Sequence, residues 1–150
     1  MADRVEFELV SPERLVLSEM VEMVVVPGTE GNFGVLPGHA PLISTIRPGM
    51  IEVYEGRVVT QRLFVAGGIA EVTPERCTVL ADEALAPEAL DRAAIEAELQ
   101  TAQGNLPSLR DQVGRAAGPD RLRLLAELRR LERDAAVAAA KLQILTEGAR

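Results

Sequence analysis

The chain has 150 residues, which fits one domain or a small domain with an appendage. Hydrophobic residues make up 47% of it but aromatic residues only 3%, so any packed core must be aliphatic. The net charge is −7, and the acidic surplus lies in residues 1–87. This excludes nucleic acid as an expected partner, because phosphate contacts need clustered Lys and Arg.

The chain carries no obvious membrane or export signal. No apolar run approaches the ~18 residues that a membrane-spanning helix needs, so we expect no direct insertion into lipid. The first residues lack the basic and then apolar pattern of a signal peptide. Cys77 is the single cysteine, so no internal disulfide is possible. These features predict a product of a reducing, cytosolic compartment.

Residues 1–86 have the pattern of short β-strands. Apolar residues alternate with polar ones, as in Val5, Phe7 and Leu9, and turn-forming residues interrupt the alternation every few positions. Glu55-Gly56-Arg57 is typical of a hairpin turn. The expected strands are residues 5–9, 21–26, 50–54, 58–59, 63–66, 69–73 and 78–81. Many short strands without intervening helices predict an antiparallel β-sandwich or flattened barrel.

Residues 87–150 have the composition of helices, rich in Ala, Leu, Glu and Arg. Pro87 suits a first helical position, and we expect the first helix to end at Gly104-Asn105. Gly118-Pro119-Asp120 predicts the end of one segment and the start of a long second helix. The chain should therefore be a β + α protein whose second domain is an antiparallel hairpin of two helices.

The second helix should pack along one apolar seam. Its residues recur with spacings of four and three, the repeat that faces a neighbouring helix. They are Leu124, Leu128, Leu131, Ala135, Ala138, Leu142 and Leu145. On the first helix the expected counterparts are Leu90, Ala94, Ala97 and Ala102.

Most side chains that catalysis requires are missing. His39 is the only histidine, so the sequence cannot form a multi-histidine metal site. A phosphate-binding loop needs Lys after its glycines, and Lys141 is the only lysine. Asp82 and Glu83 are better explained as a solvated strand end than as an acid–base pair, and Cys77 as a small core residue. We expect neither catalysis by the chain alone nor a metal or other cofactor.

Residues 27–42 are dense in glycine and proline, which predicts tight turns around short apolar segments. A nucleotide-binding loop is disfavoured, because the glycines do not precede a helix. His39 within this segment is either a structural, hydrogen-bonded histidine or part of a loop surface presented to a partner. Both interpretations remain open from the sequence.

Three blocks have a recognisable order and spacing. They are EGNFG, PGHAPL and RPGMI in residues 30–51, VAGGIAEV in residues 65–72, and TVLAD in residues 78–82. Together with the helical tail, they strongly resemble the epsilon subunit of F-type ATP synthase. The resemblance covers about the first 85 residues and the helical hairpin.

The resemblance implies a non-catalytic subunit of the central stalk, peripheral to the cytoplasmic side of the bacterial plasma (inner) membrane. Its partners would be the gamma subunit and the ring of membrane c subunits, with which it rotates to couple proton flow to ATP synthesis. By matching position, the gamma contact would be Gly67, Gly68 and Ile69. The c-ring contact would be made by the loops that hold Glu30, Gly31, Asn32, Phe33, His39, Ala40, Pro41 and Leu42.

The resemblance also implies regulation by the helices, which can extend toward the alpha and beta subunits and inhibit ATP hydrolysis. Arg129, Arg130 and Arg133 would then contact acidic segments of the beta subunit. The alternative is a solvated helix face with local ion pairs, such as Arg129 with Glu132.

The sequence does not favour regulatory ATP binding. Leu90-Asp91 matches the start of the family's ATP pattern, but Ala94 occupies the position where the pattern has Arg. We therefore expect weak ATP binding or none. Two other classes of function stay open: a free-standing protein-binding adaptor and an ATP-sensing module.

Overall fold

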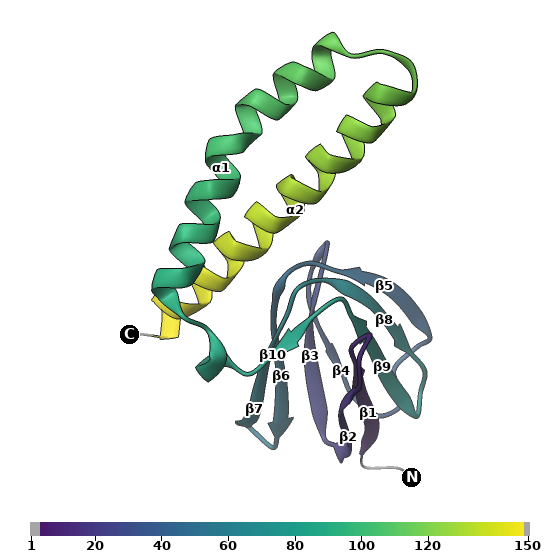
Figure 1. Cartoon of the computed structure of the whole chain (residues 1–150). Coiled ribbons are helices and arrows are strands. Elements are labelled where there is room, and N and C mark those ends of the chain that lie inside the picture. The colour runs from purple at the N-terminus through teal and green to yellow at the C-terminus, as the bar shows by residue number, and fades with distance from the viewer. Residues whose placement is uncertain (1–3, 149–150) are drawn as a thin grey trace. The chain divides into compact units, whose positions relative to one another are not determined.

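The computed structural model describes residues 4–148, which form two compact units with a boundary between Ala89 and Leu90 (Figure 1). The first unit holds ten strands and one short 3-10 helix, Pro87–Ala89. The strands are β1 (Val5–Val10), β2 (Leu15–Val21), β3 (Met23–Gly28), β4 (Gly31–Val35), β5 (Leu42–Ile46), β6 (Gly49–Glu55), β7 (Val58–Val65), β8 (Gly68–Val72), β9 (Arg76–Ala81) and β10 (Ala84–Leu85).

The strands form one strongly curved sheet in the order β10-β7-β6-β3-β5-β8-β9-β1-β2, with β4 paired to β3 (Figure 1). The predicted β-sandwich is confirmed, and so is the β6–β7 hairpin around Gly56. One pairing is not antiparallel: β1 runs parallel to β9, from Glu6 opposite Arg76 to Val10 opposite Leu80. Strands so far apart in sequence need no hairpin turn, so their relative direction was not constrained by local turn residues.

The alternation of apolar and polar residues in β1 matches the burial of their side chains. Val5, Phe7 and Leu9 have no exposed surface, whereas the glutamates between them are partly exposed. Successive side chains of a strand point to opposite faces, so one face of the curved sheet is enclosed. Cys77 lies in this core as expected, and burial raises the pKa of its thiol to about 12.

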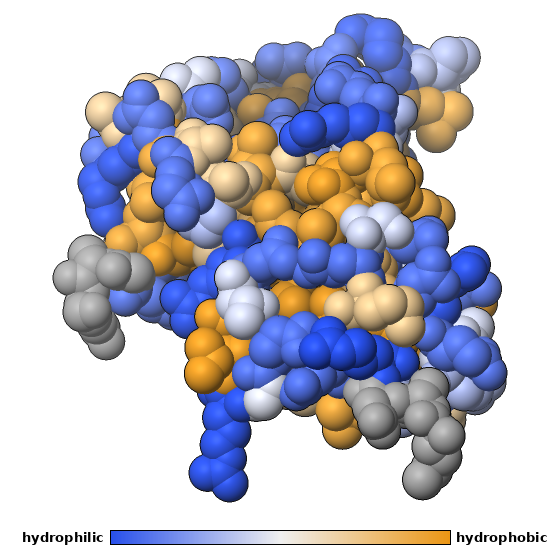
Figure 2. Space-filling view, turned by 90° about the horizontal axis from the view of Figure 1, so that it is seen from below, coloured by the Kyte–Doolittle hydropathy of each residue, from blue (hydrophilic) through white to orange (hydrophobic). Residues whose placement is uncertain are grey.

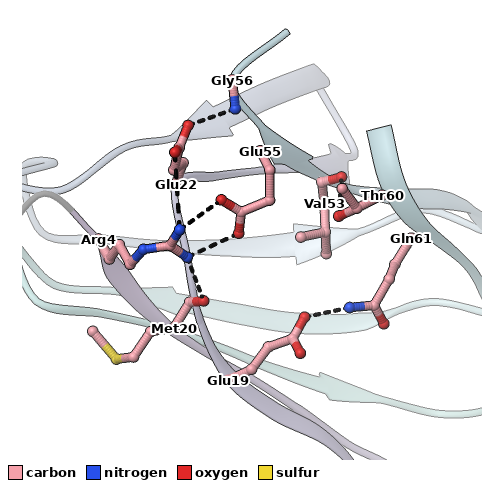
Figure 3. Close-up of polar contacts among 9 residues, drawn as sticks. All are labelled: Arg4, Glu19, Met20, Glu22, Val53, Glu55, Gly56, Thr60 and Gln61. Carbon is pink, nitrogen blue, oxygen red and sulfur yellow. Dashed lines mark hydrogen bonds and ion pairs between the residues drawn. The ribbon is translucent and has the colours of Figure 1, made fainter. Parts of the chain in front are cut away.

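Polar side chains bridge β2 to the β6–β7 hairpin, which does not pair with β2 through its backbone (Figure 3). Both terminal nitrogens of Arg4 donate to the Glu55 carboxylate at 2.9 Å, and one also donates to the Met20 carbonyl at 3.1 Å. The hydrogen bond and charge of Glu55 raise the pKa of Arg4. The Gln61 amide donates to Glu19 beside this pair. These contacts complete the closure of the sheet.

Four strands were not predicted, namely β2, β4, β5 and the short β10. Residues 21–26 were expected to form one strand, but β2 ends at Val21 and β3 begins at Met23. Residues 27–42 were expected to be turns, yet β4 pairs with β3 from Gly31 to Val35, and Leu42 begins β5. Glycine and asparagine have low strand propensity, so only the pairing supplied by β3 makes β4 a strand.

The second unit consists of α1 (Arg92–Arg115) and α2 (Gly118–Gly148), joined by two residues. The expected start of α2 is confirmed. The expected end of the first helix at Gly104-Asn105 is wrong, because α1 continues through Gly104 and also through Pro107. None of the described helices is long and apolar enough to span a membrane.

An apolar seam explains why α1 does not stop. Its buried residues are Ile95, Ala102, Leu106 and Val113, with Leu99, Leu109 and Ala116 partly buried between and after them. They recur with spacings of four and three, as in α2, and most helical stability in proteins comes from such packing. Ala94 and Ala97 are exposed, so of the expected alanines on α1 only Ala102 belongs to the seam.

The seam predicted for α2 is confirmed over much of its length. Leu124, Leu128, Ala135 and Ala138 are buried. Leu131, Leu142 and Leu145 are half-buried. Leu124 and Leu128 pack in one cluster with Leu106 and Val113 of α1.

Candidate protein-binding site

The most distinctive surface feature is the β3–β4 turn, which carries Thr29 and Glu30 between two glycines. Gly31 has a φ of 135°, a conformation that side chains disfavour. A Cβ atom on Gly28 would lie 2.8 Å from the Gly31 carbonyl oxygen, so the chain can close this tightly only without a side chain there. Glu30 is exposed at the tip of the turn.

The turn is tied to β5. The Thr29 N–H donates to the Thr45 carbonyl at 3.1 Å, and the two threonine hydroxyls are hydrogen-bonded at 2.9 Å. Arg47 donates to the Gly28 carbonyl at 2.5 Å and to the Asn32 amide oxygen at 2.6 Å. The exposed tip is therefore anchored on both sides by hydrogen bonds.

A groove of about 460 Å³ lies between this turn and the start of β5. Ile43, 74% exposed, and Leu42, 38% exposed, supply apolar surface beside the polar turn. The lining residues are Gly28, Thr29, Glu30, Gly31, Asn32, Phe33, Leu42, Ile43, Ser44 and Thr45. The structure thus brings together Glu30, Gly31, Asn32, Phe33 and Leu42, but these residues lie largely on strands and not, as expected, in loops.

His39, Ala40 and Pro41 do not line the groove. The His39 ring is half-buried, and its Nδ1 donates to the Ala40 carbonyl at 2.6 Å. The His39 N–H donates to the Leu36 carbonyl at 3.1 Å, which closes the turn before it. His39 is therefore a hydrogen-bonded residue that holds its own loop, while Ala40 and Pro41 are exposed.

Apolar side chains also reach the surface, and on the face drawn in Figure 2 they gather between hydrophilic ones. On the outer face of β8, β9, β1 and β2 they form an apolar row, which we define as Ile69, Leu80, Val10 and Leu15. Ile69 lies opposite Leu80, Leu80 opposite Val10, and Val10 opposite Leu15. Ile69, Leu80 and Leu15 are each about half exposed. Opposite residues of paired strands are close enough for their side chains to touch.

The apolar row adjoins the groove through β5. Thr45, which lines the groove, lies opposite Ile69. Sequence reasoning identified Ile69 but missed Leu80, Leu15 and Ile43. The signal was present: Thr78-Val79-Leu80-Ala81 has apolar residues at inward and outward positions alike, where a solvated face should alternate.

Gly67 and Gly68 have a structural role beside this row. Gly68 has a φ of 140°, and a Cβ atom there would lie 2.0 Å from the Leu80 carbonyl oxygen. Gly67 has a φ of 114°. Gly68 lets β8 approach β9 closely, and Gly67 supplies a positive φ just before β8. Of the three predicted contact residues, therefore, only Ile69 offers a side chain to a partner.

The residues considered for catalysis form no site. Asp82 and Glu83 are exposed just after β9, as expected for a strand end. The Asp82 N–H donates to the Gly67 carbonyl at 2.9 Å, and the Glu83 carbonyl accepts from Ala66 at 2.9 Å. Within residues 4–148, no three His, Cys, Asp or Glu side chains are grouped to hold a metal ion.

The helical candidates have simple structural explanations. Asp91 is the N-cap of α1, and its carboxylate accepts from the Ala94 N–H at 3.4 Å, while Leu90 is half-buried. On α2, Arg123 pairs with Asp120 at 2.8 Å and Glu127 at 3.2 Å, and the Asp120 hydrogen bond raises the pKa of Arg123.

Arg129, Arg130 and Arg133 are exposed on α2, and the described part of the chain offers them no ion pair. The local pair of Arg129 with Glu132 is therefore absent from this structure. Arg133 follows Arg129 by four positions and Arg130 by three, so the three residues lie within about 100° of the helix circumference.

Comparison with known proteins identifies the family of the chain. Residues 4–87 match the family described as ATP synthase, Delta/Epsilon chain, beta-sandwich domain. The chain is 58% identical over 116 residues to the ATP synthase epsilon chain of Rhodospirillum rubrum, covering 77% of this chain and 87% of the relative. It is 45% identical over 129 residues to that of Parvibaculum lavamentivorans, covering 86% and 98%.

A chain in the Euglena gracilis mitochondrial ATP synthase assembly of OSCP, F1 and c-ring has the same fold. Its TM-score is 0.70 at 22% identity, with 97% of this chain and 83% of that chain covered. The match in the β-sandwich domain and the identity to relatives over most of their length show that the chain belongs to the ATP synthase epsilon chain family.

Proposed function

We propose that the chain is the non-catalytic rotor subunit of a proton-translocating ATP synthase, where it links the membrane ring to the central stalk. The observation that best supports this proposal concerns the domain matched to the family over residues 4–87. This domain presents two adjoining surfaces of different chemistry, the groove and the apolar row. A linking subunit needs two such contacts. Its place is peripheral, on the cytoplasmic side of the bacterial inner membrane.

The groove is assigned to the ring of c subunits, together with His39, Ala40 and Pro41 on the neighbouring loop. Its tip carries Glu30 and its rim carries Leu42 and Ile43, so it suits a partner with both polar and apolar groups. His39 acts there by shape, because its Nδ1 is already engaged by the Ala40 carbonyl. We expect the His39 imidazole to transfer no proton.

The apolar row is assigned to the gamma subunit, with Gly67 and Gly68 holding Ile69 in position. Exposed apolar side chains that are contiguous across paired strands are typical of surfaces buried by a protein partner. An outward row of aliphatic residues across four strands is otherwise a risk of aggregation in a free protein. Burial against gamma removes that risk.

The helical hairpin is assigned to regulation. Arg129, Arg130 and Arg133 are exposed and form no ion pair within the described part of the chain, so an acidic segment of the beta subunit is a suitable partner when the hairpin extends toward alpha and beta. Such contact would inhibit ATP hydrolysis. Regulatory ATP binding is not favoured, because Asp91 is used as a helix cap.

Co-purification tests the gamma assignment. Tagged full-length chain should retain the gamma subunit, whereas Leu80→Asp should lower retention at least about tenfold, since a buried unpaired carboxylate is costly. The matched control is Val58→Asp, at an exposed apolar residue outside the row. Equal retention by the wild type and Leu80→Asp would refute the assignment, provided that Leu80→Asp remains folded by circular dichroism.

A further inference from the structure

Arg47 lies directly after β5, and both its main chain and its side chain contact the β3–β4 turn. Its N–H donates to the Pro27 carbonyl at 2.9 Å. Its guanidinium donates to the Gly28 carbonyl at 2.5 Å and to the Asn32 side chain at 2.6 Å. The planar guanidinium holds several donors in fixed directions, so one side chain can serve two acceptors at once.

The acceptors lie on the two sides of the exposed tip. Pro27 and Gly28 precede Thr29 and Glu30, whereas Asn32 follows them. Arg47 therefore connects the incoming and outgoing arms of the turn to each other and to β5. It is half-buried, and both of its side-chain acceptors are neutral groups, so it is not held in place as part of a surface ion pair.

The β3–β4 pairing extends to Gly28 opposite Gly31 and joins the two arms of the turn, but few contacts join the tip to β5. The two glycines that flank the tip have more backbone freedom to lose than other residues. Backbone pairing between β3 and β5 is limited to Gly28 opposite Ile46. Apart from Arg47, the turn is tied to β5 mainly by the two hydrogen bonds between Thr29 and Thr45.

We infer that Arg47 is a positioning residue for the ring contact: it holds the Thr29–Glu30 tip in its binding orientation before the partner arrives. The inference rests on the proposed function of the groove. Arg47 acts through Gly28 and Asn32, and ordering the turn in advance reduces the entropy that binding must remove. Losing this order lowers the fraction of chains that are ready to bind and raises the apparent Kd by the same factor.

The first test uses the free full-length chain and measures amide hydrogen exchange at the turn. Arg47→Ala should speed exchange of the Thr29 N–H about tenfold, since hydrogen bonds that order the turn are lost. Arg47→Lys should have an intermediate effect, because its ammonium can still donate to one acceptor but cannot reproduce the fork of donors. The matched control is Arg62→Ala, which removes an exposed arginine paired with Glu52. Unchanged exchange in Arg47→Ala would overturn the inference.

The second test adds full-length chain to membrane vesicles whose ATP synthase lacks this subunit, and follows ATP-driven proton pumping. Arg47→Ala should raise the half-saturating concentration about three- to tenfold, while pumping at saturation stays at the wild-type level. A general loss of folding would also raise this concentration, so circular dichroism must show that Arg47→Ala is as fully folded as the wild type. Arg47→Ala and Asn32→Ala should be non-additive, because they remove the same hydrogen bond.

A tip variant separates this inference from the function on which it rests. If Glu30→Arg raises the half-saturating concentration but Arg47→Ala does not, the ring contact stands and the positioning role is wrong. If the chain restores pumping and neither variant changes its half-saturating concentration, the ring contact at this turn is itself wrong. Parallel increases in both variants, with Arg62→Ala unchanged, support the positioning role.

Discussion

At the scale of single residues, Gly68 shows how a short motif is fixed by packing. Its φ is 140°, and a Cβ atom added there would meet the Leu80 carbonyl oxygen at 2.0 Å, so there is no room for a side chain. Gly68→Ala should lower the free energy of unfolding by about 2–4 kcal/mol, from backbone strain and displacement of β9. Urea unfolding of the purified chain measures this. The control is Gly38→Ala, which has a φ of 83° but no neighbouring atom within 4 Å and should lose less.

Asp91 separates a structural explanation from a ligand-binding one. As the N-cap of α1, it should be replaceable by Ser with little loss, whereas Asp91→Ala should lower the stability of the hairpin by about 1 kcal/mol. Thermal unfolding compares the two variants. In calorimetric titrations, ATP should give no saturable heat with the wild type. Saturable heat at millimolar ATP that Asp91→Ala abolishes would show that Asp91 contributes to a nucleotide site.

Cys77 predicts a dependence of stability on alkaline pH. Its folded-state pKa of about 12 lies above the ordinary value of 9.0, so the folded chain holds this proton more tightly than the unfolded chain. The stabilising contribution is therefore fully present below pH 9 and is lost as pH rises toward 12. Cys77→Ala should show a weaker fall in stability over that window, measured by urea unfolding. At pH 8 the native thiol should react with a thiol reagent only upon unfolding, and rapid labelling of the native chain would contradict this.

At the scale of elements, α1 illustrates what local sequence cannot predict. Gly104 and Pro107 are strong local reasons to end a helix, and they led to the wrong boundary at Gly104-Asn105. The residues that outweigh them are spaced along the whole segment, from Leu99 to Val113, and their effect depends on burial against α2. By contrast, the alternation in β1 and the Gly56 hairpin are local features, and both were predicted correctly.

Removing these local costs should stabilise α1. Gly104 is exposed, and nothing lies within 4 Å of a Cβ placed there, so Gly104→Ala should raise the stability of the hairpin by about 0.5–1 kcal/mol. Pro107→Ala should raise it further, because the helix regains a backbone hydrogen bond. Hydrogen exchange across residues 99–113 measures both effects. Faster exchange in either variant would show that the interruption is required for packing.

The residues of the candidate site were predictable where a local sequence pattern marks them, and not where they depend on pairing between distant strands. Residues 30–33 and Leu42 were identified from their turn-rich segment, and the structure brings them to one groove. Leu80 and Leu15 were missed because their significance depends on sheet order: β9 lies beside β1, and β1 beside β2. Because β1 and β9 are parallel and some 70 positions apart, no hairpin turn joins them, and no local sequence pattern marks their pairing.

At the scale of the whole molecule, the two compact units predict a division of labour. Residues 1–89 include all the described strands, the groove and the apolar row, and they bury a core of their own. A chain truncated after Ala89 should remain folded by circular dichroism and should still bind gamma. Loss of binding by a folded truncated chain would show that the helices belong to the gamma contact.

The central claim is that this chain couples the membrane ring to the central stalk, and proton-driven ATP synthesis tests it most directly. Membrane vesicles whose ATP synthase lacks this subunit are energised with a proton gradient, and ATP formation is measured after adding the full chain, residues 1–89, or neither. The account predicts no coupled synthesis without the subunit and comparable synthesis with either form. Failure of the folded full chain to restore synthesis, while it binds gamma normally, would contradict the account.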